Sequence, residues 1–181
     1  MENITNIKAI TFDTGGTILD WHSGFLEAFK KIGEKYQLQK DWVRLTNKLR
    51  KCSLIKVTNL GEERAPEINI DDAHRLCLDK ILKDEDIDQI SEDDRYFLSK
   101  IVPYSFECWK DFPHVLPKLR ERFIVCSFTV LSFKMVIETS RKNGLSWDAI
   151  FSCEGIKKYK LLPDSYKTAA KYLQLDPSEI L

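Results

Sequence analysis

The chain alternates short apolar runs with longer stretches in which hydrophobic residues recur every three or four positions. Residues 7–12 form an apolar run that stops at an aspartate and two glycines, which is typical of a short buried strand. Two further runs, 123–128 and 149–153, have the same character. We therefore predict three strands, each followed by a segment with helical periodicity.

The stretch from residue 21 to about 109 has helical periodicity throughout and no pattern typical of a strand. Within it, the charged stretch 56–66 is predicted to be a loop. Asp71 or Asp72 is expected to cap the next helix, and Ser91 the helix after it. These signals together predict an all-helical insert.

Helical patterns return between and after the later strands, at residues 113–120, 131–142 and 163–173. Gly144 closes the second of them in the manner of a left-handed cap, and Asp176 opens one more. Strands and helices that alternate in this order imply parallel pairing with right-handed crossovers. The expected fold is therefore α/β, with a parallel sheet core.

Length and composition agree with one packed core that carries an insert. The chain has 181 residues, of which 43% are hydrophobic and 31% charged. We assign residues 1–20 and 110–181 to the α/β core and residues 21–109 to the helical insert. The formal net charge is zero, so the charge balance favours neither nucleic acid nor an anionic membrane as a partner.

The sequence shows neither a targeting segment nor a disulfide framework. The N-terminus lacks a cationic start, and no run approaches the ~20 apolar residues of a membrane helix. The cysteines are odd in number and lack Cys-x-x-Cys spacing, so we expect free or buried thiols in a reducing compartment. They are Cys52, Cys77, Cys108, Cys126 and Cys153. We expect a cytoplasmic protein.

The clearest chemical feature follows the first predicted strand. Asp13 stands at the end of this strand, and Gly15, Gly16 and Thr17 come after it. In an open α/β sheet, ligands collect at the carboxyl ends of the strands, so Asp13 is a candidate nucleophile. Backbone N–H groups of the glycine turn would suit an anion. The alternative is structural, because Asp-x-Gly-Gly is also an ordinary turn sequence.

The segment Phe-Asp-x-x-Gly-Thr-Ile near the N-terminus resembles the first signature of the haloacid dehalogenase-like (HAD) hydrolase superfamily. From Trp109 onward the chain is similar to the 2-haloacid dehalogenase branch, in Trp-x-Asp-x-Pro, Leu-Arg-x-Arg-Phe-Ile, Gly-Leu-x-Trp-Asp-Ala-Ile and Tyr-Lys. The resemblance covers nearly the whole chain. It implies a HAD-type Rossmann-like core in which the insert is an α-helical cap over the nucleophile.

The resemblance also implies roles for the residues of the first signature. In that superfamily the aspartate forms a covalent intermediate that water hydrolyses, so Asp13 is the implied nucleophile and Thr17 belongs to the catalytic set. Phosphatase members carry a second aspartate two positions later, to protonate the leaving alcohol, where this chain has Gly15. A halide leaves without a proton. Gly15 therefore favours dehalogenation over magnesium-dependent phosphate ester hydrolysis.

Thr129 and Lys160 match the second and third signatures. Thr129, with Ser127 as the fallback, would hydrogen-bond the anion, and Lys160 would neutralise the carboxylates around the nucleophile. Without the resemblance, Thr129 is an ordinary strand-ending residue and Lys160 a solvated lysine. Val130 and Leu161 stand where the branch usually has Asn and Pro, which keeps a non-catalytic relative among the alternatives.

Dehalogenases of this branch also use a cap arginine to hold the substrate carboxylate or to receive the halide. Arg44 and Arg50 are the candidates, although a helix face rich in Lys and Arg is first of all a solvated one. The acidic fourth signature is expected beyond Leu181, so the C-terminal part of the core is expected to be missing.

The combined expectation is a HAD-like hydrolase that cleaves the carbon–halogen bond of a small acid through an aspartyl ester. Its substrate-binding groups would be Gly15, Gly16, Arg44 and Arg50. No cofactor or metal is expected, and magnesium enters only with the phosphatase alternative. The expected partner is a small-molecule substrate, without nucleic acid or membrane, and the chain is compatible with a homodimer. A truncated or non-catalytic HAD relative is the remaining alternative.

Overall fold

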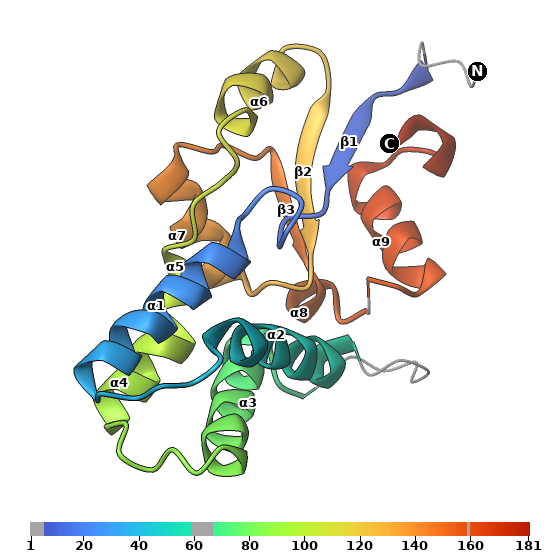
Figure 1. Ribbon diagram of the computed structural model, residues 1–181. Coiled ribbons are helices and arrows are strands. Elements are labelled where there is room, and N and C mark those ends of the chain that lie inside the picture. Colours follow the sequence, from blue (N-terminus) through green and yellow to red (C-terminus); the bar gives the residue numbers. More distant parts are fainter. Residues whose placement is uncertain (1–5, 59–66, 159) are drawn as a thin grey trace.

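Figure 1 shows the computed structural model, which describes residues 6–58, 67–158 and 160–181. Three parallel strands form one sheet in the order β1-β2-β3. They are β1 (Ala9–Phe12), β2 (Ile124–Thr129) and β3 (Ala149–Ser152). Phe12 pairs with Ser127, and Phe128 with Phe151, so the strands finish at the same edge of the sheet. The three predicted strands are confirmed, each to within two residues.

Helices cover both faces of the sheet, as is usual when strands are parallel. They are α6 (Phe112–Arg120), α7 (Phe133–Asn143), α8 (Cys153–Ile156), α9 (Pro163–Leu173) and the 3-10 helix η3 (Pro177–Glu179). α6 and α7 pack on the face that carries Val125, whereas α9 packs on the face of Cys126 and Phe128. α7 ends at Gly144 with a left-handed φ of 65°, as predicted.

The segment between β1 and β2 is helical. Its elements are α1 (Trp21–Lys35), α2 (Trp42–Thr58), α3 (Ile70–Asp84), α4 (Glu92–Tyr96), the π-helix η2 (Phe97–Ile101) and α5 (Val102–Tyr104). These helices lie beyond the edge at which the strands finish (Figure 1). The fold is therefore α/β, with a helical layer placed next to the carboxyl ends of the sheet.

Two predicted boundaries in this segment need correction. α2 continues to Thr58, so residues 56–58 are helical, and residues 59–66 lie outside the described residues. Asn69, and neither Asp71 nor Asp72, caps α3, because its side chain accepts the N–H of Asp72 at 3.1 Å. This earlier start brings Ile70 into the core, where it is fully buried. Ser91 caps α4 as predicted.

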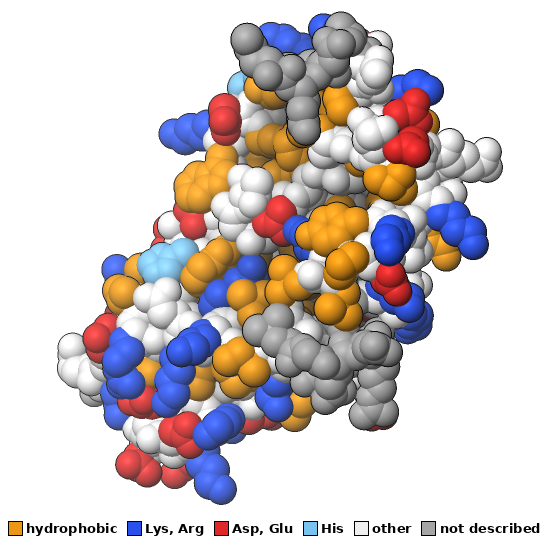
Figure 2. All heavy atoms as spheres, turned by 90° about the vertical axis from the view of Figure 1, so that its right-hand side faces the viewer, with side chains coloured by type: hydrophobic (Ala, Val, Ile, Leu, Met, Phe, Trp, Pro, Cys, Tyr) orange, Lys and Arg blue, Asp and Glu red, His pale blue; other side chains and the backbone are white. Residues whose placement is uncertain are grey.

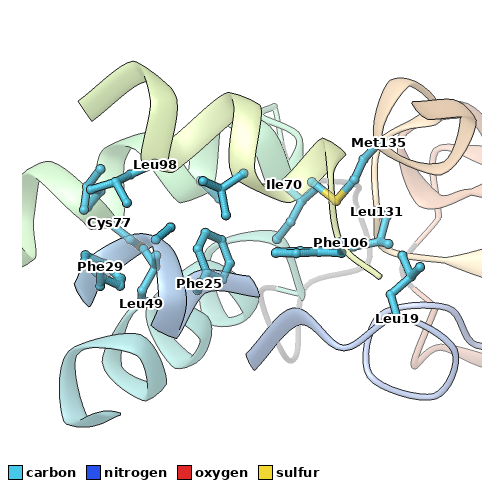
Figure 3. Close-up of a cluster of buried hydrophobic side chains, with 14 of the residues drawn as sticks. Leu19, Phe25, Phe29, Leu49, Ile70, Cys77, Leu98, Phe106, Leu131 and Met135 are labelled. Atoms are coloured by element: carbon cyan, nitrogen blue, oxygen red, sulfur yellow. The ribbon is translucent and has the colours of Figure 1, made fainter. Parts of the chain in front are cut away.

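One hydrophobic core joins the helical layer to the sheet (Figure 3). Phe25 meets Phe106 edge to face, with ring centroids 5.0 Å apart. Leu19, Leu131 and Met135 extend this core to the segments that follow β1 and β2. Continuous packing of this kind fixes the position of the helices relative to the strand ends.

A disulfide between Cys52 and Cys77 joins α2 to α3, with Cα atoms 5.8 Å apart. The expectation of free thiols is therefore wrong for this pair, whereas Cys108, Cys126 and Cys153 are free. An odd count and the lack of Cys-x-x-Cys spacing say nothing about cysteines 25 positions apart that helix packing brings together.

The surface mixes both signs of charge. On the face shown in Figure 2, basic and acidic side chains alternate, in keeping with the zero net charge of the chain. Within the described residues, no helix has the length and apolar character needed to cross a membrane.

Leu181 bonds to β1 along the edge that faces away from β2. Thr11 N donates to Leu181 O at 2.7 Å, and Leu181 N donates to Ala9 O at 3.0 Å.

Candidate active site

The loop that carries Asp13 is firmly held at the end of β1. Gly16 has a φ of +112°, a conformation that residues with a side chain rarely adopt. A buried hydrogen bond of 2.7 Å joins the hydroxyls of Thr14 and Ser127 and ties the loop to β2. Ser127, the fallback for the second signature, therefore supports the loop. The indole N–H of Trp109 adds a bond of 3.1 Å to Gly16 O.

Both carboxylate oxygens of Asp13 accept hydrogen bonds. The hydroxyl of Thr17 donates to Oδ2 at 2.7 Å, and the ammonium of Lys160 donates to Oδ1. The Asp13 side chain is 42% exposed whereas that of Lys160 is only 15% exposed, so the carboxylate is open and its cation is covered. The structure thus brings together Asp13 and Lys160, which are 147 positions apart in the sequence.

Arg50 reaches the same loop from α2. Its Nη2 donates to Gly15 O at 2.9 Å, and the centre of its guanidinium lies 5.2 Å from the centroid of the Trp21 ring. Burial lowers the pKa of Arg50 to about 10, while the negative charge of Asp13 acts in the opposite direction. Arg50 therefore remains a cation at neutral pH and places positive charge beside the carboxylate.

The space next to Gly15 is already filled. A Cβ atom added to Gly15 would lie 3.1 Å from Nη2 of Arg50 and 3.3 Å from Cδ2 of Leu131. A carboxylate side chain at this position would therefore displace or pair with the Arg50 guanidinium. Arg50 stands where the general acid of a phosphatase would have to enter.

Thr129 contributes to the turn after β2. It is fully buried, and its hydroxyl accepts the N–H of Leu131 at 3.1 Å. It lies opposite Ser152 at the end of β3. Thr129 thus has a structural role in the turn after β2. Its contact with a bound anion stays a prediction.

Arg44 lies outside the cluster around Asp13, and its role in substrate binding stays a prediction. Its Nη1 and Nη2 donate to the two carboxylate oxygens of Glu85, at 2.9 and 2.6 Å, and its side chain is 53% exposed. Hydrogen bonds from Arg44 lower the pKa of Glu85 to about 2. Arg44 and Arg50 leave α2 on different faces, and only Arg50 is directed to the loop of Asp13.

No protein-family model matches the chain, and no curated protein matches it. Solved structures do match. The defluorinating L-2-haloacid dehalogenase Rha0230 aligns over 96% of this chain and 71% of its own, with a TM-score of 0.84 and 24% identity. The L-2-haloacid dehalogenase PA0810 aligns over 96% and 74%, with a TM-score of 0.84 and 23% identity. This chain has the L-2-haloacid dehalogenase fold.

A structure of the L-2-haloacid dehalogenase from Xanthobacter autotrophicus with chloropropionic acid covalently bound also has this fold. It aligns over 96% of this chain and 68% of its own, with a TM-score of 0.76 and 18% identity. A HAD family enzyme from Bacteroides thetaiotaomicron gives a TM-score of 0.60. The fold implied by the sequence resemblance is confirmed.

Two aromatic residues beside the Asp13 loop were not predicted as site residues. Trp21 directly follows the loop and contacts Arg50, and Trp109 bonds the loop backbone. Trp21, judged from sequence alone, fits a hydrophobic core equally well, whereas Trp109 belongs to the Trp-x-Asp-x-Pro motif of the resemblance but had no assigned role. Among residues 6–58, 67–158 and 160–181, no three His, Cys, Asp or Glu side chains are grouped as a metal site would require.

Proposed function

We propose that this chain is a hydrolase of the haloacid dehalogenase type, which displaces halide from the carbon next to the carboxylate of a small 2-halo acid. The observation that carries the proposal is an open carboxylate, Asp13, held between the Thr17 hydroxyl and the Lys160 ammonium with the Arg50 guanidinium beside it. One anionic nucleophile beside two cations suits an anionic substrate.

In the first step, a carboxylate oxygen of Asp13 attacks the halogen-bearing carbon. A carbon–oxygen bond forms while the carbon–halogen bond breaks, and the electron pair of that bond leaves with the halide. Thr17 and Lys160 hold the carboxylate in one orientation, which reduces the entropy lost on reaching the transition state. The product of this step is an ester between Asp13 and the acid.

In the second step, water attacks the carbonyl carbon of that ester. The bond between this carbon and the ester oxygen breaks, the 2-hydroxy acid leaves, and the Asp13 carboxylate is restored. The positive charge of Lys160 stabilises the negative charge that develops on the carbonyl oxygen. The overall reaction consumes one water and releases halide and a proton.

Arg50 supplies the second cation of the proposed site. Its guanidinium offers several N–H donors to a halide or a carboxylate, and one of these is already used by Gly15 O. Its position beside Gly15 also argues against the magnesium-dependent phosphatase, because the space for a leaving-group acid is filled by Arg50 and Leu131. In this proposal, the helical segment 21–109 acts as the cap that delivers Arg50 to the nucleophile.

The test is halide release from the two enantiomers of 2-chloropropanoate by the wild type and by Asp13→Asn. Asp164→Asn is the matched control, since Asp164 is 65% exposed on α9 and lies outside the site. We expect release by the wild type and the control, and none by Asp13→Asn. An aryl phosphate with magnesium is assayed in parallel, and hydrolysis of the phosphate without halide release would refute the proposal.

A further inference from the structure

Trp21 and the loop of Asp13 both contact the Arg50 guanidinium. The guanidinium carbon lies 5.2 Å from the centroid of the Trp21 ring. The carbonyl of Gly15 accepts a bond from Nη2 at 2.9 Å. A guanidinium over an aromatic face is attracted by the negative charge density of the ring.

The backbone fixes the place of the Trp21 ring. Trp21 is the first residue of α1, and Asp20 caps this helix by accepting the N–H of Ser23 at 3.0 Å. The indole nitrogen of Trp21 would lie 3.1 Å from a Cβ atom added to Gly16. The ring therefore rests against a bare stretch of loop backbone, which only a glycine leaves free.

Within the described part of the chain, one N–H donor of the Arg50 guanidinium is used and the others have no acceptor. Among the hydrogen bonds of the described residues, Gly15 O is the one acceptor of its five N–H groups. The guanidinium is partly buried, and its other nitrogens are not among the buried, unpartnered atoms of the described residues, so their N–H groups stay accessible to a small anion. A long arginine side chain also has many rotamers, so a ring that holds the guanidinium removes orientations in which those donors would miss the anion.

We propose that Trp21 is a positioning residue that holds the Arg50 guanidinium against the nucleophile loop, with its free N–H groups directed at a small anion bound beside Asp13. This inference rests on the proposed function in one respect, since the anion is taken to be the halide or carboxylate of the substrate. Trp21 contacts Arg50 and takes no part in the reaction itself, in which Asp13 is the nucleophile.

The first test needs no enzymatic activity. In a nitrogen–proton correlation spectrum of the arginine side chains, the Nε–H signal of Arg50 is assigned by its loss in Arg50→Lys. The ring current of Trp21 should displace this signal from the other arginines. Trp21→Leu should remove the displacement, and Trp21→Phe should keep part of it. An undisplaced Arg50 signal in the wild type would overturn the proposal, whatever the variants do.

The second test measures anion binding by titrating sodium bromide against the same signal. Loss of one aromatic contact to a partly buried cation is expected to weaken bromide binding about tenfold in Trp21→Leu. Trp21→Phe should stay within about threefold of the wild type. Trp42→Phe is the matched control, because Trp42 stacks on Phe29 and should leave bromide binding unchanged. Equal bromide affinity in Trp21→Leu and the wild type would overturn the proposal.

Steady-state kinetics distinguish a failure of the role of Trp21 from a failure of the proposed function. Trp21→Leu should raise KM for 2-chloropropanoate about tenfold and lower kcat much less, since the nucleophile is intact. If the wild type binds bromide with the expected Trp21 dependence but releases no halide from any 2-halo acid, the proposed function fails and the role of Trp21 stands. Asp13-dependent release with an unchanged KM in Trp21→Leu would overturn the role of Trp21 alone.

Discussion

Opening the disulfide between Cys52 and Cys77 is expected to destabilise the fold while leaving Asp13 and its partners unaltered. The bridge spans 25 positions and ties α2 to α3. Loop-closure entropy for a loop of this length corresponds to about 3.5 kcal/mol of stability. For a chain of this size, that loss lowers the melting temperature by about 10 °C.

Calorimetry with and without dithiothreitol measures this effect on the wild type and on the double variant Cys52→Ala, Cys77→Ala. The reductant should lower the melting temperature of the wild type alone, because the variant has no bridge to lose. Thiol labelling in denaturant gives an independent count, with three reactive thiols before reduction and five after it. Five thiols before reduction would refute the bridge. Three thiols with an unchanged melting temperature would refute the entropy argument.

Substitutions at Gly15, at the two cap arginines and at His74 test the site and its surroundings. Gly15→Asp should pair with Arg50 and raise KM for 2-chloropropanoate at least about tenfold without creating phosphatase activity, with Gly15→Ala as the milder control in the same kinetic assay. Arg44→Ala should change halide release less than about twofold, because Arg44 pairs with Glu85 at the surface, whereas Arg50→Ala should reduce it about a hundredfold or more. Burial lowers the pKa of His74 from 6.5 to about 3, so between these pH values the unfolded state binds a proton that the folded state does not, and stability falls as the pH falls. His74→Leu should therefore move the midpoint of acid unfolding, followed by circular dichroism, to lower pH, and an unchanged midpoint would contradict this.

The sheet was predictable because its signals are local. Each strand is a short apolar run ended by a polar or small residue, and helix α9 begins and ends at the predicted residues 163 and 173. Gly144 is a similar case, since its left-handed conformation follows from one residue type at a helix end. Such features depend on neighbours in the sequence and need no knowledge of tertiary packing.

Features that depend on packing were not predictable. Asn69, Asp71 and Asp72 are all good helix caps, and the structure has Asn69 at the cap with Ile70 buried directly after it. The pairing of cysteines in α2 and α3 likewise follows from how those helices pack, which the spacing of the residues does not reveal.

In the candidate site, too, some residues could be identified from the sequence and others depend on packing. The resemblance singled out Asp13 and Lys160, and the structure joins them by a hydrogen bond. It gave no means of choosing between Arg44 and Arg50, because the choice depends on which face of α2 meets the nucleophile loop. The contact of Trp21 with Arg50 has no counterpart in the sequence pattern, since any tryptophan at that position suits a core equally well.

In the proposed mechanism, Asp13 forms an ester which water opens at the aspartyl carbonyl. A single turnover in water enriched in heavy oxygen, with protein in excess over 2-chloropropanoate, tests it directly. We expect heavy oxygen in the peptide that contains Asp13 when the protein is digested and analysed by mass spectrometry. Heavy oxygen found only in the hydroxyl group of the released 2-hydroxy acid, with none in Asp13, would mean that water attacks the substrate directly and would refute the aspartyl ester.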